Sequence, residues 1–421
     1  MVASAARMIQ LTAEWLLPIV GDPIRRGMVT IAQGRIVEVS GEVSPGAVDM
    51  GHSVLMPGLV NAHTHLELSH LRGLVPPASR LPDWVRTLMA VRRDTARTAA
   101  EIDEAIDHAI AESVATGTVL VGDVGNSLAS VPRLRGSRLG GRVFHELIGF
   151  GPADVPARVA SARAALDAVA TVEHDLRLGL APHAPYSVSP ALFSAIREDL
   201  DRYDTVSSVH LGESPEEVEF LQRGTGPWRM LLEELGAWNT GWRVPAASPV
   251  EYLSSLDFLD ARVLVVHGVQ LNGEDLSRLA AMGITIVSCP RSNRHVGVGS
   301  PPVEAFYAMD VPVAFGTDSL ASAPDLNVFS EMAEARRLAP RVSARKLLES
   351  ATLVGARALG FGDRYGSLER GKRAALIAVR VPEGVANVEE YLVSGVPRDA
   401  VRRVDDESGD GPGGSDRPYG P

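Results

Sequence analysis

The chain has 421 residues, of which 45% are hydrophobic and 22% are charged, an ordinary composition for a globular protein with a large core. Its formal net charge of −11 is spread along the chain, so no basic patch argues for a nucleic-acid partner. No apolar run is long enough to span a membrane, and the chain does not begin like a secretory signal. The single cysteine, Cys289, excludes an intrachain disulfide and a cysteine-based zinc site. We therefore predict a cytoplasmic protein without nucleic-acid or membrane partners.

Short β-like runs fill both ends of the sequence. Residues 28–32 and 35–39 are apolar runs joined by Gln33 and Gly34, a pattern that predicts a hairpin. Near the other end, residues 366–380 have the pattern of a turn followed by a buried strand. These runs predict one small β-sandwich domain made from both termini, residues 1–55 and 364–402. Residues 405–421 are mainly Gly, Pro and Asp without an apolar pattern, which predicts a disordered tail.

The middle of the chain alternates between β-branched apolar runs and helix-like stretches. Alternation of this kind indicates parallel strands, and eight repeats favour a closed barrel. The alternative is an open doubly wound sheet, but no GxGxxG or GxxxxGKS loop follows the first strand. We predict a (β/α)8 TIM-like barrel over residues 56–363. Its strands are the run before His63 and residues 118–123, 142–149, 176–183, 206–211, 262–267, 284–289 and 313–318.

Histidines mark the carboxyl ends of these strands, where barrel enzymes build their active sites. His63 and His65 lie two residues apart in NAHTHLELS, so both imidazoles point to the same side of a strand. Any one such histidine is more simply a polar surface residue, but several strand ends together argue for a site. His63, His65, His210 and Asp318 form a nitrogen and oxygen set suited to Zn or Fe. The strand ends carry His63 with His65, His183, His210, His267 and Asp318.

Glu213 lies three residues beyond His210, which places it near a metal without making it an obvious ligand. A carboxylate at this position can take a proton from water and return it to a substrate nitrogen. The alternative is a glutamate in the first turn of a helix, since SPEE follows and acidic residues favour that position. Because the predicted metal ligands lie close by, we predict that Glu213 is catalytic.

These residues, in the order PGLVNAHTH, HLGE, VHGVQL, SCPRSN and GTDSLAS, resemble the mononuclear deaminase and chlorohydrolase branch of the amidohydrolase superfamily. The resemblance implies that Glu213, His267 and Asp318 are catalytic. It also implies one divalent metal, for which Zn is favoured and Fe is the alternative. The lysine that bridges two metals in other branches is missing, because neither Lys346 nor Lys372 is near the fourth strand. The implied metal ligands are His63, His65, His210 and Asp318.

Within this branch, HTHLELS, APHAPYS and GTDSLAS look most like the aminodeoxyfutalosine deaminases. Strand-end or early-loop positions, with side chains that can stack on or hydrogen-bond a purine, predict substrate contacts at Glu67, Trp84, His183 and Arg291. The alternative is a packed Trp with surface Glu and Arg residues. The expected reaction is hydrolytic deamination of an aminopurine nucleoside, with 6-aminodeoxyfutalosine of menaquinone biosynthesis as the first candidate.

Two alternatives stay open. One is a deaminase or chlorohydrolase acting on S-adenosylhomocysteine, guanine, a pterin or a triazine. The other, of a different class, is a catalytically inactive relative that serves as a scaffold. The expected partner is a small-molecule substrate, and the sequence leaves a homodimer open.

Overall fold

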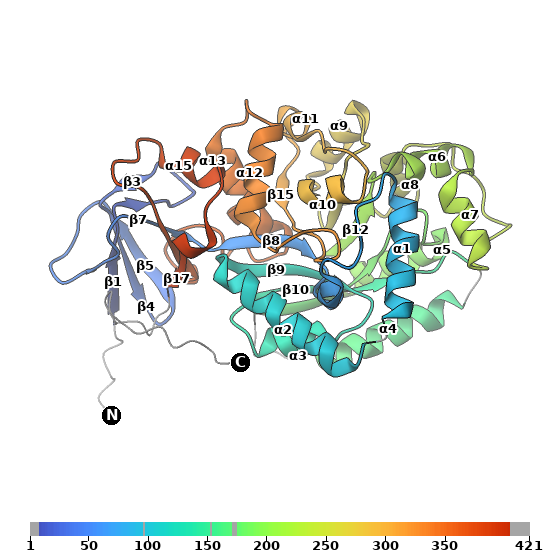
Figure 1. Ribbon diagram of the computed structural model, residues 1–421, viewed down its shortest axis with the longest axis horizontal. Coiled ribbons are helices and arrows are strands. Elements are labelled where there is room, and N and C mark those ends of the chain that lie inside the picture. Colours follow the sequence, from blue (N-terminus) through green and yellow to red (C-terminus); the bar gives the residue numbers. More distant parts are fainter. Residues whose placement is uncertain (1–7, 96, 152–153, 171–174, 405–421) are drawn as a thin grey trace.

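The computed structural model of the chain describes residues 8–95, 97–151, 154–170 and 175–404. A β-rich part, formed from both ends of the chain, lies beside a larger part in which helices surround strands (Figure 1). The tail predicted over residues 405–421 lies outside the described residues.

The predicted hairpin near the amino terminus is present as β4 (Met28–Ala32) and β5 (Arg35–Ser40), which pair antiparallel. Gln33 and Gly34 connect them with φ angles of 51° and 68°, the left-handed values that suit a two-residue turn between twisted strands. The sheet has the order β5-β4-β1-β6 and is completed by β1 (Met8–Thr12) and β6 (Val48–Asp49).

A second sheet joins the two ends of the chain. β7 (Ser53–Pro57) pairs antiparallel with β16 (Leu376–Arg380). The two sheets share one buried core, to which Leu11, Ile31 and Leu376 contribute. The sheet has the order β17-β16-β7-β2-β3 and is completed by β2 (Trp15–Leu16), β3 (Ile24–Arg25) and β17 (Val401–Val404), with the short η3 (Arg398–Ala400) before β17.

One segment between β16 and β17 is helical. α15 (Val388–Val393) buries Val388 and Leu392, which lie four residues apart and therefore on one helix face. Both belong to the hydrophobic cluster that also holds residues of the barrel helices α12 (Val328–Leu338) and α13 (Ala344–Glu349). The prediction of a β domain over residues 364–402 did not include this helix.

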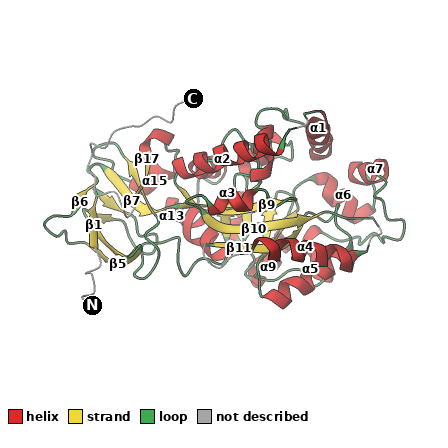
Figure 2. Ribbon diagram, turned by 90° about the horizontal axis from the view of Figure 1, so that it is seen from below, coloured by secondary structure: helices red, strands yellow, loops and turns green. Residues whose placement is uncertain are grey.

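Eight parallel strands form the larger part, in two sheets of order β11-β10-β9-β8 and β12-β13-β14-β15. Hydrogen bonds connect the sheets at both seams. The His210 N–H donates to the His183 carbonyl at 2.9 Å, and the Thr317 N–H donates to the His63 carbonyl at 3.0 Å. These contacts agree with the predicted (β/α)8 barrel. Figure 2 shows β9, β10 and β11 side by side, with helices on both sides of them. The strands are β8 (Leu59–Thr64), β9 (Thr118–Gly125), β10 (Gly140–Leu147), β11 (Leu176–Pro182), β12 (Ser207–Leu211), β13 (Val263–His267), β14 (Ile286–Ser288) and β15 (Val313–Phe315).

Helices cover the outside of the strands. Among the described residues, none of them has both the length and the hydropathy that a membrane span needs. They are α1 (Leu81–Asp94), α2 (Ala99–Ala115), α3 (Ser130–Arg135), α4 (Val155–Val169), α5 (Pro190–Tyr203), α6 (Pro215–Arg223), α7 (Pro227–Glu234), α8 (Pro249–Ser255), α9 (Gly273–Met282), α10 (Pro290–His295), α11 (Val303–Ala308), α12, α13 and α14 (Gly355–Ala358), with the short η1 (Leu66–Leu71) and η2 (Ser350–Val354).

Apolar side chains fill the barrel interior, so it is a packed core and not a channel. A substrate site must therefore lie at one end of the strands, and the predicted histidines all lie at the carboxyl end. The buried interior cluster includes Val60, Ala62, Leu120, Phe144, Ala181, Leu264, Val266, Val287 and Ala314.

Candidate active site

The four predicted metal ligands converge at the carboxyl end of the barrel. The ring centroid of His63 lies 4.8 Å from that of His65 and 5.0 Å from that of His210. The carboxylate oxygen Oδ1 of Asp318 lies 3.6 Å from Nε2 of His65 and 3.9 Å from Nε2 of His63. Strands β8 and β12 and the turn after β15 thus bring residues far apart in sequence to one point.

This cluster fits a divalent metal on its own chemistry. Both ring nitrogens of His63 are buried without a hydrogen-bond partner in the described structure, a costly arrangement unless a ligand satisfies them. Burial, together with the neighbouring histidines, lowers the pKa of His63 far below its usual value and that of His210 to about 3. Neutral imidazoles are the form that binds a metal. Burial works against ionisation of Asp318, but His65 and His267 outweigh it and lower its pKa.

Hydrogen bonds fix the orientation of these ligands. Nδ1 of His210 donates to the His183 carbonyl at 3.0 Å, so Nε2 is the nitrogen left for a metal. Oδ2 of Asp318 accepts from the Ser292 hydroxyl at 2.6 Å, and Oδ1 accepts from the Ser319 N–H at 2.7 Å. Partners of this kind set the ring orientation and the basicity of metal ligands.

His267 completes the group from the end of β13. Its ring lies 5.8 Å from that of His63 and 5.4 Å from that of His210, so it is close enough to share an ion with them. However, Nδ1 of His267 accepts from the Asn293 amide at 3.0 Å, which leaves the proton of the neutral ring on Nε2. Burial lowers the pKa of His267 to about 4 and favours this neutral form.

The backbone is strained at two of these positions. His267 has a φ of 77° and Asp318 a φ of 60°, left-handed values that cost a non-glycine residue on the order of 1–3 kcal/mol. His267 is the last residue of β13 and Asp318 lies three residues beyond the end of β15, and both side chains are directed toward the ligand cluster. Strain of this kind is characteristic of functional sites, where surrounding contacts hold it in place.

Glu213 lies just before α6, and it is not part of the helix. The helix N-cap is Ser214, whose hydroxyl accepts from the Glu217 N–H, and the first-turn acids are Glu216 and Glu217. The Glu217 carboxylate accepts the N–H groups of Gly212 and Glu213, each at 2.9 Å. This anchoring role of Glu217 was not visible in the sequence, where the residue resembled an ordinary helix-start acid.

The Glu213 side chain points to the ligand cluster. Its carboxylate oxygen Oε1 lies 3.5 Å from Nε2 of His267, and both side chains are buried. Burial, then the charges of Asp318 and Glu217, raise the pKa of Glu213 well above its usual value. Burial therefore favours the protonated form of this carboxyl more than water does, and its place beside the ligand cluster suits a general acid and base.

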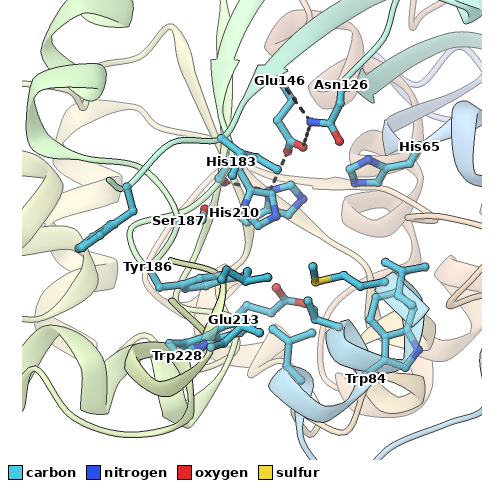
Figure 3. A pocket seen from close by; sticks show the side chains of 18 of the residues that line it. His65, Trp84, Asn126, Glu146, His183, Tyr186, Ser187, His210, Glu213 and Trp228 are labelled. Atoms are coloured by element: carbon cyan, nitrogen blue, oxygen red, sulfur yellow. Dashed lines mark hydrogen bonds and ion pairs between the residues drawn. The ribbon is translucent and has the colours of Figure 1, made fainter. Parts of the chain in front are cut away.

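A cavity of about 620 Å³ opens from the cluster (Figure 3). This volume is in the usual range for small-molecule sites. Its inner end holds His65, His210, His267, Glu213 and Asp318. Its outer walls are mainly apolar and include Leu68, Leu81, Trp84, Leu88, Met89, Ile148, Phe150, Tyr186, Trp228, Leu231 and Leu235.

Three of the four predicted substrate contacts line this cavity. Trp84 on α1 and His183 after β11 face it, and Nδ1 of His183 is held by the Ser187 hydroxyl at 2.6 Å. Glu67 also lines the cavity, but its carboxylate already accepts the N–H groups of Asn126 and Ser127, both at 2.9 Å.

The sequence matches the Amidohydrolase family over residues 54–398. The chain belongs to the amidohydrolase family. Among its relatives, the aminodeoxyfutalosine deaminase of Deinococcus radiodurans is 32% identical over 353 residues, which cover 81% of each chain. The 5-methylthioadenosine/S-adenosylhomocysteine deaminase of Teredinibacter turnerae is 29% identical, over 88% of this chain and 83% of that protein. The solved structure of an adenosine deaminase from Xanthomonas campestris with bound zinc superposes with a TM-score of 0.79 at 28% identity, covering 93% of this chain and 90% of that one. The predicted resemblance and the predicted enzyme class, a hydrolase of carbon–nitrogen bonds, are confirmed.

The structure of this amidohydrolase places Arg291, the fourth predicted substrate contact, in a buried ion pair. The cavity enclosed by the described residues is not lined by Arg291. Its guanidinium pairs with the fully buried carboxylate of Glu331 on α12, Nε to Oε1 at 2.6 Å, and with Asp325 at 2.8 Å. The arginine thus serves as the counter-charge of a buried acid and fastens α10 to α12. Glu331 lies 40 residues from Arg291 in the sequence, so no local sequence pattern predicts this ion pair.

Other residues of the amidohydrolase line the cavity without having been predicted. The rings of Tyr186 and Trp228 stack at a centroid distance of 3.8 Å and an angle of 7°, and they form one wall of the cavity (Figure 3). Glu146, at the end of β10, contributes a carboxylate. In the sequence, only its position near a strand end indicates that Glu146 could line the site.

Proposed function

We propose that this amidohydrolase deaminates an aminopurine nucleoside by hydrolysis, with one divalent metal. The observation that carries the proposal is the position of Glu213, a buried carboxylate outside the four-residue ligand set and 3.5 Å from Nε2 of His267. Hydrolytic deamination needs a group beside the attacking water that can both accept and deliver a proton. The catalytically inactive scaffold does not explain why a carboxylate is kept at this buried position.

His63, His65, His210 and Asp318 would hold the metal. When bound, a divalent cation supplies Lewis acidity that lowers the pKa of a water molecule to about 7. Zinc is the proposed ion, supported by the zinc in the related adenosine deaminase structure, and iron is the alternative that the same donor set accepts.

The residues around the ligand cluster divide the remaining work. The Nε2–H of His267 orients the attacking oxygen, and Asp318 accepts a hydrogen bond from it. Glu213 takes the water proton and delivers it to the adjacent purine ring nitrogen as the new carbon–oxygen bond forms at the amino-bearing carbon. The second proton of the attacking water passes from the new hydroxyl through Asp318 to the amino group. The carbon–nitrogen bond then breaks and ammonia leaves, which converts the aminopurine to its oxo form.

The cavity supports a nucleoside with an extended 5′ substituent. Its polar end matches the base, and the apolar outer walls would contact a group that a plain nucleoside lacks. The names of two relatives given above include such compounds. One is named for 5-methylthioadenosine and S-adenosylhomocysteine, and the other for aminodeoxyfutalosine. We place 6-aminodeoxyfutalosine first, as a step of menaquinone biosynthesis, because the relative with that name is 32% identical.

The experiment is a measurement of ammonia release by the zinc-loaded protein. The panel contains adenosine, 5′-methylthioadenosine, S-adenosylhomocysteine and 6-aminodeoxyfutalosine, with guanine, a pterin and a chlorotriazine for the alternatives. For the chlorotriazine, chloride release is measured as well, because its dechlorination yields no ammonia. The proposal expects ammonia and the oxo product from at least one aminopurine nucleoside, with the highest kcat/KM for a 5′-substituted one. Turnover of guanine, the pterin or the triazine alone would contradict it.

A further inference from the structure

Glu146 places a buried carboxylate at the cavity, and no described lysine or arginine forms an ion pair with it. The residue is 6% exposed and lines the cavity from the end of β10. Its Oε1 is buried and has no hydrogen-bond partner among the described residues. The nearest positively chargeable atom, Nδ1 of His210, lies 3.6 Å away, but its proton goes to the His183 carbonyl at 3.0 Å. An acceptor buried in this way is costly unless a ligand supplies a donor.

The carboxylate is held in place from the other side. The amide nitrogen of Asn126 donates to Oε2 of Glu146 at 2.9 Å and to the Glu146 backbone carbonyl at 3.3 Å. The pair therefore presents one oxygen, Oε1, in a fixed direction. Glu67 nearby differs, because its two oxygens accept from the backbone of Asn126 and from Ser127.

The position of Glu146 separates it from the reacting end of the cavity. It faces the Nδ1 edge of His210, whereas the Nε2 edge is the one left for the metal. Figure 3 shows Glu146 and Asn126 on one side of His210 and Glu213 on the other. A donor that reaches Glu146 must therefore belong to a part of the substrate about one imidazole ring away from the ligand cluster.

We propose that Glu146, positioned by Asn126, forms a hydroxyl-binding subsite for the sugar of the substrate. The assignment rests on the proposed function. An aminopurine nucleoside whose 5′ substituent carries no donor, such as adenosine or 5′-methylthioadenosine, has only two kinds of hydrogen-bond donor, the amino group of the base and the hydroxyl groups of the sugar. The amino group must lie at the ligand cluster, where it is replaced. The donor for Oε1 of Glu146 is then a sugar hydroxyl.

The same carboxylate selects against phosphorylated substrates. Glu146 lines the cavity, so a phosphate on the hydroxyl that it binds would meet the like charge of its carboxylate. The subsite thus defines the substrate class as a nucleoside with a free sugar hydroxyl, and not a nucleotide phosphorylated at that hydroxyl. A site built to bind a hydroxyl rejects the analogue that lacks it, because its own acceptor is then left unpaired.

The test is equilibrium binding to the zinc-loaded protein, measured by calorimetry with inosine and 2′,3′-dideoxyinosine, which need no turnover. Because a hydrogen bond to a charged group is involved, the wild type should bind inosine at least about ten-fold more tightly than the dideoxy compound. The Glu146→Ala variant should lower this ratio to near one, and Glu146→Gln should give an intermediate ratio, since an amide oxygen still accepts. 2′-Deoxyinosine and 3′-deoxyinosine then identify which hydroxyl is bound.

Glu304→Gln is the matched control, because Glu304 on α11 is paired with Arg341 and does not line the cavity. It should keep the wild-type ratio. An unchanged ratio in Glu146→Ala that still binds zinc and inosine would overturn the subsite, as would a wild type that binds both compounds equally. Ammonia release on the same samples keeps the proposals distinct. An active wild type with no inosine preference defeats the subsite alone, whereas absence of deamination defeats the proposed function.

Discussion

Oε1 of Glu213 lies 3.5 Å from Nε2 of His267, and both side chains are buried at the inner end of the cavity. Neither belongs to the proposed set of four ligands. Hydrogen bonds fix both residues. The Glu217 carboxylate accepts the backbone N–H of Glu213, and the Asn293 amide donates to Nδ1 of His267. In the proposed site, Glu213 and His267 are thus distinct from the residues that would hold the metal, and substitutions can distinguish the two roles.

Replacing His63 by alanine should remove the metal. Its two ring nitrogens are buried without partners in the described structure, and the ligand set would lose one of three imidazoles. We expect metal content to fall from about one divalent ion per chain to near zero, as measured by elemental analysis of protein purified without chelator, with activity lost in parallel.

His108→Ala is the control for that experiment, since His108 is an exposed residue of α2. It should retain the wild-type metal content. A His63→Ala protein that keeps its full metal content would place the ion elsewhere, and two ions per wild-type chain would contradict the single-metal site.

Replacing Arg291 by methionine should damage stability and leave substrate affinity unchanged. The substitution leaves the fully buried carboxylate of Glu331 without its guanidinium, and breaking a buried ion pair in this way costs about 3–5 kcal/mol. Denaturant unfolding measures the loss. Arg294→Met on the same helix removes an exposed arginine paired with Glu334 and should cost about 0–1 kcal/mol. A large rise in KM with normal stability would restore Arg291 as a substrate contact.

Ending the chain after Phe361 should give insoluble protein. The deletion removes β16, which pairs with β7 along its length, for example Val379 with Val54. It would expose the edge of β7 and the apolar core that the two sheets share. A chain that ends at Val404 keeps every element described at this end and should remain soluble and active. Soluble, active protein from the shorter chain would show that the barrel does not need this pairing.

The sequence was sufficient to predict the residues of the site that lie at strand ends. Parallel strands end on one side of a barrel, so the spacing of His63 and His65 and the later strand ends was enough to predict the cluster. Contacts between segments far apart in the sequence could not be predicted in this way. The Arg291 pair with Glu331 and the stack of Tyr186 on Trp228 depend on how separate loops and helices meet, and no periodic pattern records such a meeting.

The most direct measurement is metal content and ammonia release on one sample of Glu213→Gln. The substitution keeps the shape of the side chain and removes its ability to cycle a proton. We predict near-normal metal content with kcat lower by about 10²–10⁴-fold, and a much smaller change in KM. Glu216→Gln, in the first turn of α6 and outside the cavity, should turn over at nearly the wild-type rate. A Glu213→Gln protein with full metal and a rate within a few-fold of wild type would contradict the proton-transfer role. Loss of the metal would instead assign Glu213 to the ligand set.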